Sequence, residues 1–161
     1  MSMGMVYAMM GAATAVILSG IGSSLGIKYT ASASSGVMRE DPRNFGKYLI
    51  LTALPGTQGI YGFVAAFLII MKIGPVVVSG KIDTVTASLG LQLFFASLPI
   101  AVNGLISAIA QGKVCTAGVG LTAQHPDQSG KALVLAVFVE FYAVLGLIIT
   151  IFLLNNINLG G

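Results

Sequence analysis

Charged residues are scarce in this chain of 161 residues, which also has a single cysteine and no tryptophan. Asp, Glu, Lys and Arg make up 8% of the sequence, and apolar residues make up 56%. Because soluble domains carry about one quarter charged residues, a soluble globular fold is excluded, and the hydrophobicity also excludes a disordered chain. Cys115 has no second cysteine to pair with, and the scattered basic residues form no stripe for nucleic acid. An integral membrane protein remains.

The few charges leave four apolar windows that are long enough to span a membrane, which takes about 20 residues. These windows are residues 1–27, 48–71, 84–112 and 132–154. Only the fourth window contains a charged residue, Glu140. We therefore expect an all-α membrane protein with four transmembrane helices. The first window lacks the basic residues that open a secretory leader, so we expect it to be retained.

The basic residues predict the orientation of the chain. The connection between the first two windows carries four Lys or Arg residues and the connection between the last two carries two, against two in the middle connection and none at the termini. Cytoplasmic loops carry the excess of Lys and Arg. We therefore predict that the first and third connections are cytoplasmic and that both termini lie outside the cell membrane.

The chain contains an internal repeat. A shift of 84 residues, such as that from Gly20 to Gly104, aligns its two halves without a gap. Identical pairs at this shift include Ser23 with Ser107, Pro42 with Pro126, Gly46 with Gly130, Lys47 with Lys131, and Leu51 with Leu135. We therefore predict two tandem hairpins of parallel orientation, residues 1–71 and 72–161. Glu140 aligns with Gly56, so only the second hairpin carries an ion-binding carboxylate.

Small residues line one face of the first window at helical spacing. They are Gly11, Ala15, Ser19, Gly22 and Gly26. In lipid, small residues allow two helix backbones to approach closely. We interpret this face as a surface for helix packing.

Glu140 is the strongest candidate for a functional residue. A carboxylate in the middle of a membrane span is costly and usually faces a partner or a cavity. A structural ion pair is one alternative, although no window contains a Lys or Arg to form it. A permanently protonated and inert Glu140 is the other.

Spacing places several polar groups at the depth of Glu140. Gln111 and Glu140 lie equally far from the turn at residues 125–126, and Thr57 and Gln58 lie at the corresponding distance from the turn at residues 41–42. On the second helix, one face carries Leu54, Thr57, Gln58 and Tyr61.

Pro55 is predicted to distort the second helix at this level, which most directly frees the Leu51 carbonyl. With Gly56 following, the same distortion can also turn the Leu54 carbonyl outward. A carboxylate with carbonyl, amide and hydroxyl oxygens suits a hard alkali cation. The surplus of oxygen ligands favours sodium over a proton.

Three segments resemble a known family. They are LPGTQGIYG at residues 54–62, AQGK at residues 110–113 and VEFYAVLG at residues 139–146. They closely resemble the four-helix rotor-ring proteolipid, the K or c subunit, of V-type (bacterial V/A-type) ATPases. The resemblance covers all four helices and is strongest to the sodium-transporting branch.

The resemblance implies a role for each site residue. Glu140 is expected to carry Na⁺, with oxygen ligands from Thr57, Gln58, Gln111 and the Leu54 carbonyl. Tyr61 is expected to hydrogen-bond Glu140 and hold the site closed. Li⁺ is expected to compete, and no organic cofactor is implied.

The resemblance also implies an assembly in a bacterial cell membrane. The expected partners are identical subunits in a closed ring, a stator subunit with an essential arginine, a central-stalk subunit on the cytoplasmic side, and membrane lipids. Because the chain has no phosphate-binding loop of the type Gly-x-x-x-x-Gly-Lys-Ser/Thr, we expect it to be a non-catalytic subunit.

Three alternatives for the function stay open. One is a proton-carrying rotor-ring subunit of the same family. Another is a structural pore-forming or junctional four-helix protein, which would not need polar groups from three helices at one level. The last, from a different class, is a small multidrug or cation antiporter. Such antiporters stack aromatic side chains on lipophilic cations, and this chain has no tryptophan and few aromatic residues near Glu140.

Overall fold

The computed structural model describes residues 2–158, whose regular structure is entirely helical. The elements are α1 (Met3–Met38), η1 (Pro42–Asn44), α2 (Phe45–Ala53), η2 (Leu54–Gly56), α3 (Thr57–Val78), η3 (Ile82–Thr84), α4 (Ala87–Gln124), η4 (Pro126–Gln128) and α5 (Ser129–Asn156), where η marks a 3₁₀ turn. Four of the helical stretches are long and apolar enough to cross a membrane, with η1, α2, η2 and α3 forming one of them. The predicted all-α membrane fold is confirmed.

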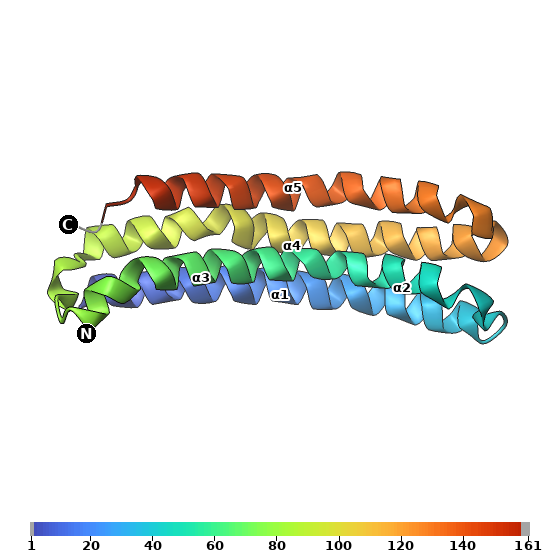
Figure 1. Cartoon of the computed structure of the whole chain (residues 1–161), viewed down its shortest axis with the longest axis horizontal. Coiled ribbons are helices and arrows are strands. Elements are labelled where there is room, and N and C mark those ends of the chain that lie inside the picture. The colour runs from blue at the N-terminus through green and yellow to red at the C-terminus, as the bar shows by residue number, and fades with distance from the viewer. Residues whose placement is uncertain (1, 159–161) are drawn as a thin grey trace.

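The chain forms two hairpins that lie side by side (Figure 1). The first pairs α1 with the stretch α2–η2–α3, and the second pairs α4 with α5. Both hairpin turns lie at one end of the molecule, and the two termini and the connection through η3 lie at the other (Figure 1). The tandem repeat therefore produces two hairpins of the same orientation.

The helices are longer than the charge-free windows. The helix α1 continues past Lys28 to Met38, and α4 continues past Lys113 to Gln124. A charged residue at the edge of a window indicates where the apolar environment ends. It does not end the helix, because the helix continues as long as its backbone hydrogen bonds are made. Residue 71, the predicted end of the first hairpin, lies inside α3, so that division of the chain stays a prediction.

The helices α1 and α4 pack closely through the small-residue face, all five members of which are buried. A Cβ atom added to Gly22 would come 2.6 Å from the Cα atom of Leu105 in α4. Two hydroxyl groups bridge the same helices: Ser19 Oγ donates to the Ile100 carbonyl at 3.2 Å, and Thr30 Oγ1 donates to the Gly112 carbonyl at 3.1 Å. The interpretation of this face as a packing surface is confirmed.

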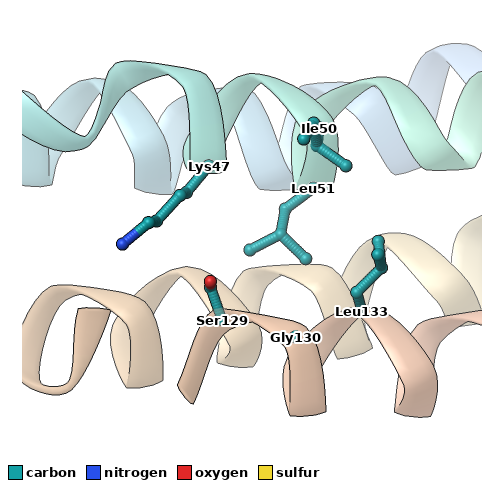
Figure 2. Close-up of a pocket in the computed structure, with 6 residues that line it drawn as sticks. All are labelled: Lys47, Ile50, Leu51, Ser129, Gly130 and Leu133. Carbon is teal, nitrogen blue, oxygen red and sulfur yellow. The ribbon is translucent and has the colours of Figure 1, made fainter. Parts of the chain in front are cut away.

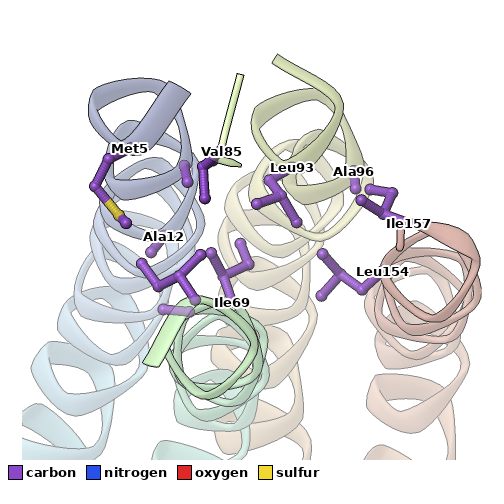
Figure 3. Packing of buried hydrophobic residues seen from close by; sticks show 11 residues of the cluster. Met5, Ala12, Ile69, Val85, Leu93, Ala96, Leu154 and Ile157 are labelled. Carbon is purple, nitrogen blue, oxygen red and sulfur yellow. The ribbon is translucent and has the colours of Figure 1, made fainter. Parts of the chain in front are cut away.

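Apolar side chains form one cluster near each end of the bundle. The cluster at the terminal end includes Met5, Ile69, Leu93 and Leu154 (Figure 3). The cluster near the hairpin turns consists of Tyr48, Leu51, Cys115, Val119, Ala132 and Ala136. The polar layer described next lies between them.

The turn of the first hairpin is fixed by Asp41. Its carboxylate accepts hydrogen bonds from the backbone N–H and the Nε of Arg43, at 3.0 and 2.9 Å. These bonds, led by those of the Arg43 side chain, lower the pKa of Asp41. The carboxylate therefore stays ionised and caps the 3₁₀ turn η1 that leads into α2.

Candidate ion-binding site

The helical break at Pro55 positions the first three groups of the site. The 3₁₀ turn η2 interrupts the helix between α2 and α3, and Thr57 follows it directly. The Leu54 carbonyl accepts hydrogen bonds from the Thr57 backbone N–H and from Thr57 Oγ1, the latter at 3.0 Å. Thr57 Oγ1 also donates to Gln58 Oε1 at 3.3 Å. The break thus gathers a carbonyl, a hydroxyl and an amide oxygen within one turn.

The amides of Gln58 and Gln111 join the two hairpins. Gln58 Nε2 donates to Gln111 Oε1 at 2.7 Å, and both side chains are fully buried, at 0% exposure. Buried amides are costly unless they are hydrogen-bonded. This pair therefore fixes the α3 and α4 helices at the level of the site.

Glu140 in α5 completes the cluster. Its Oε1 accepts a hydrogen bond from the Tyr61 hydroxyl at 2.6 Å, and its Oε2 accepts one from Gln111 Nε2 at 3.4 Å. Gln111 Nε2 also donates to the Ala136 carbonyl, one turn before Glu140, at 3.0 Å. Among residues 2–158, the only salt bridge joins Arg43 and Asp41. The structural ion pair considered for Glu140 is therefore not formed within this part of the chain.

The structure brings together every residue of the predicted set. Leu54, Thr57, Gln58, Gln111, Tyr61 and Glu140 form one hydrogen-bonded chain that crosses three of the four helical stretches. Gln58 and Gln111 are fully buried, whereas Thr57, Tyr61 and Glu140 are partly exposed on the single chain. The carboxylate thus lies at the outer edge of a buried amide layer.

Sequence reasoning missed one contributor from the fourth stretch, α1. Ser23 Oγ accepts a hydrogen bond from the Gly59 backbone N–H at 2.8 Å, next to Gln58. Ser23 belongs to the identical pairs of the internal repeat, which was the signal available in the sequence. Its partner is a backbone group, and no sequence pattern reveals which N–H points at a hydroxyl.

The arrangement suits a small hard cation. Glu140 supplies a charge, and the Leu54 carbonyl, Thr57 hydroxyl and the two glutamine amides supply neutral oxygen atoms of the kind that alkali and alkaline-earth ions prefer. The Leu54 carbonyl, the two amide oxygens and the Glu140 carboxylate accept hydrogen bonds from the amide N–H groups and from the Thr57 and Tyr61 hydroxyls, whereas Thr57 Oγ1 acts as a donor. Binding and release of an ion therefore exchange cation contacts for hydrogen bonds.

Comparison with known proteins places the chain in a family. Residues 10–69 and 94–153, one stretch in each hairpin, match the family described as the C subunit of ATP synthase. The two matches agree with the internal repeat.

Individual relatives match nearly the whole chain. The V-type sodium ATPase subunit K of Enterococcus hirae is 45% identical over 95% of this chain and 93% of its own length. The A-type ATP synthase subunit K of Methanocaldococcus jannaschii is 37% identical over 97% of this chain and 65% of its own length. The human 16 kDa proteolipid of the V-type proton ATPase is 30% identical over 91% of this chain and 90% of its own length. The chain therefore belongs to the family of the ATP synthase C subunit, among the membrane proteolipids of V- and A-type ATPases.

Proposed function

We propose that this protein is the Na⁺-carrying subunit of the rotor ring of a V-type rotary ATPase, with Glu140 as the ion-carrying carboxylate. The observation that supports this most directly is the oxygen-rich cluster around Glu140, in which the fully buried Gln58 and Gln111 meet. A proton carrier needs one acceptor beside the carboxyl group, whereas this cluster has ligands for a dehydrated cation. The 45% identity to a subunit of a sodium ATPase, against 30% to a subunit of a proton ATPase, also favours sodium.

The cost of a bare charge in lipid supplies the mechanism. An ionised Glu140 facing hydrocarbon costs several kcal/mol, so each subunit moves past the lipid only when a cation neutralises it. At the stator, an arginine replaces Na⁺ as the countercharge, and the ion leaves. Tyr61 and Gln111 then hold the emptied carboxylate by the hydrogen bonds described above.

Rotation couples this exchange to the rest of the complex. Moving one elementary charge across about 100 mV requires about 2.3 kcal/mol, which torque from a central stalk supplies. The subunit itself moves ions without catalysing ATP hydrolysis. In this proposal the two hairpin turns face the cytoplasm and contact the stalk, in accord with their excess of Lys and Arg.

The family assignment removes the antiporter alternative, and one labelling experiment distinguishes sodium from proton transport. A hydrophobic carbodiimide reacts with a protonated carboxyl group in the membrane. Membranes containing the assembled complex are labelled at fixed pH with and without Na⁺, and modification of Glu140 is followed by mass spectrometry. We expect Na⁺ to protect Glu140, because the bound cation displaces the proton.

The controls use potassium at equal ionic strength and the Glu140→Gln variant, which removes the reactive carboxyl group. Li⁺ is expected to protect as well. Equal labelling of Glu140 with and without Na⁺ would instead identify a proton carrier of the same family.

A further inference from the structure

The two hairpins contact each other near their turns, through side chains of α2 in the first hairpin and residues at the start of the second hairpin's α5. Lys47 Nζ donates a hydrogen bond to the Pro126 carbonyl at 2.8 Å, across 79 residues of sequence. In Figure 2 the Lys47 and Leu51 side chains extend from α2 toward α5, where Ser129 and Leu133 line the same pocket of about 90 Å³. Leu51 is only 2% exposed because the second hairpin covers it. A lysine and a leucine thus dock one hairpin on the other.

The second hairpin has a lysine and a leucine at the same repeat positions, but no further hairpin of this chain covers them. Lys131 and Leu135 are the equivalents of Lys47 and Leu51 in the internal repeat. Leu135 is 59% exposed, and Lys131 is exposed and makes no side-chain hydrogen bond to residues 2–158. Leucine and lysine at equivalent positions of the repeat are therefore covered in the first hairpin and exposed in the second.

The first hairpin carries a pocket at the corresponding repeat positions. The side chains that cover Leu51 belong to Cys115, Val119, Ala132 and Ala136. Their equivalents, 84 residues earlier, are Ala31, Ser35, Tyr48 and Thr52. All four of these line one pocket of about 110 Å³ between α1 and α2. The rim of that pocket includes Phe45 and Leu49, which are 54% and 51% exposed.

We infer that this pocket receives Leu135 of a second copy of the chain, while Lys131 of that copy donates a hydrogen bond to the Pro42 carbonyl. The inference rests on the proposed ring and specifies the register in which neighbouring copies meet. Pro42 is the repeat equivalent of Pro126, and its carbonyl accepts a hydrogen bond from the Phe45 backbone N–H. The oxygen has a second lone pair for the lysine.

The pocket on the first hairpin is stronger evidence for a contact between copies than the exposure of Leu135. Lipid covers an exposed leucine as well as protein does, so exposure in a membrane does not by itself indicate a partner. A pocket lined at the four repeat positions that surround Leu51 in the second hairpin does indicate one. The register also explains why Pro-x-x-x-Gly-Lys is shared by both hairpins: each copy of the motif supplies a lysine in one direction and a carbonyl in the other.

Cysteine cross-linking in the membrane tests the register. Ile50 and Leu133 line the same pocket within the chain, and their equivalents across copies are Val134 and Leu49. Complexes carrying V134C and L49C, in a background with Cys115→Ala, are treated with a short, membrane-permeant bis-maleimide. We expect a ladder of oligomers on a denaturing gel. The matched pair I50C and L133C is expected to cross-link within one chain and remain monomeric, and each single cysteine is expected to give no ladder.

The outcomes separate the register from the ring. The same membranes are treated with glutaraldehyde, which reports oligomers of any register. Oligomers with glutaraldehyde but none with the cysteine pair would overturn the register and leave the proposed ring standing. Monomers with both reagents would overturn the ring and the register together.

The lysine is tested separately. Lys131→Met is expected to increase several-fold the fraction of monomer released when the assembled ring is warmed in detergent. Lys113→Met removes another exposed lysine at the same end of the molecule and serves as the control. Equal release from both variants would overturn the role of Lys131 in the contact.

Discussion

Gln111 uses both ends of its amide to tie the site together. Its oxygen accepts from Gln58, and its nitrogen donates to the Ala136 carbonyl and to Glu140. It is fully buried, so each of these bonds replaces one that water would otherwise supply. Gln111 is thus the amide of the described site that bonds both to α3, through Gln58, and to the Glu140 carboxylate. Gln111 therefore controls the alignment of Gln58 with Glu140.

Replacing either glutamine is predicted to weaken sodium binding. Gln111→Ala removes an oxygen ligand and a hydrogen bond to the carboxylate, and bonds to charged groups contribute about 1.5–3 kcal/mol. That corresponds to about a ten- to hundred-fold loss of affinity. Gln58→Ala is predicted to act in the same direction. The measurement is the Na⁺ concentration that half-protects Glu140 from carbodiimide.

Gln92→Ala is the matched control for these variants. It removes an exposed glutamine of the same helix, near the terminal end and far along α4 from the site. Its half-protecting concentration should equal that of the unaltered protein. A glutamine variant whose affinity matched that of Gln92→Ala would remove its residue from the proposed ligand set.

The sequence was sufficient to place these residues at one level but insufficient to predict how they bond. Equal spacing from two turns defines depth because a helix rises uniformly. Which amide nitrogen meets which oxygen depends on side-chain rotation, so the pairing of Gln58 with Gln111 required the structure. The Ala136 carbonyl gave no signal at all, because an alanine in a helix marks no particular acceptor.

At the scale of elements, the broken helix α2–η2–α3 depends on α1 for its position. The break at Pro55 places Thr57 and Gln58 in the first turn of α3. The Gly59 N–H in the same turn donates to Ser23 Oγ. Behind the break, a Cβ atom on Gly26 would come 2.7 Å from Pro55 Cβ, so α1 is packed directly against it. The α1 helix thus acts as a rigid support for the ligands of α3.

Ser23→Ala is therefore predicted to weaken sodium binding although the hydrogen bond of Ser23 is to the Gly59 backbone and not to a proposed ligand side chain. The partly buried Gly59 N–H loses an acceptor, and leaving a fully buried donor unpaired costs about 1–3 kcal/mol, which sets the upper limit here. Part of that cost is relieved by movement of the turn that carries Gln58. We expect the half-protecting Na⁺ concentration for Glu140 to rise about three- to tenfold, for an effect of about 1 kcal/mol.

The repeat supplies the control for this prediction. Ser107 is the equivalent of Ser23, is 4% exposed, and has a hydroxyl without a partner among residues 2–158. Its counterpart helix α5 has Val139 where the first hairpin has Pro55, so α5 has no break at this level. Ser107→Ala should leave sodium affinity unchanged. Equal shifts from the two variants would show that loss of a buried serine, and not loss of its bond to Gly59, weakens binding.

Helix ends were harder to predict than helices. Charges defined the four apolar windows, and each window lies mainly within a helical stretch of the structure. The ends were missed because Lys28 and Lys113 sit within continuing helices, where a long lysine side chain reaches the aqueous boundary. The turn at Pro42 was better marked, because a proline and the capping Asp41 coincide there.

At the scale of the whole molecule, the repeat predicted the fold but not which surfaces remain open. Two parallel hairpins follow from a uniform shift of 84 residues, as from Gly20 to Gly104. Identical residues at this shift then have different surroundings, as Leu51 and Leu135 show. The sequence does not reveal which residue of such a pair is buried between hairpins and which is exposed. The structure shows that Leu51 is buried and Leu135 exposed, and the exposed residue marks where the next copy is expected.

Gly20 provides a separate test of that expectation. Its equivalent, Gly104, is packed so tightly that an added Cβ atom would collide with Ser19 Oγ and lie 2.9 Å from Ser19 Cβ. A Cβ atom on Gly20 meets nothing within 4 Å in the single chain. If copies meet in the register of the repeat, Gly20 of one copy faces Asn103 of its neighbour, the equivalent of Ser19. Gly20→Ala should then leave the fold of the single chain unchanged and weaken the contact between neighbouring copies in the ring.

We therefore predict that Gly20→Ala inserts into the membrane in normal amount but forms rings that dissociate more readily when warmed in detergent. Gly36→Ala is the control on the same helix, because neither Gly36 nor its equivalent Gly120 has an atom within 4 Å of an added Cβ. Alanine favours a helix over glycine by about 1 kcal/mol, so Gly36→Ala should leave the ring intact or slightly firmer. The measurement is the temperature at which half of the ring releases monomers. A ring carrying Gly20→Ala as stable as one carrying Gly36→Ala would mean that neighbouring copies do not bring Asn103 against Gly20, and that the contact between copies departs from the contact between hairpins.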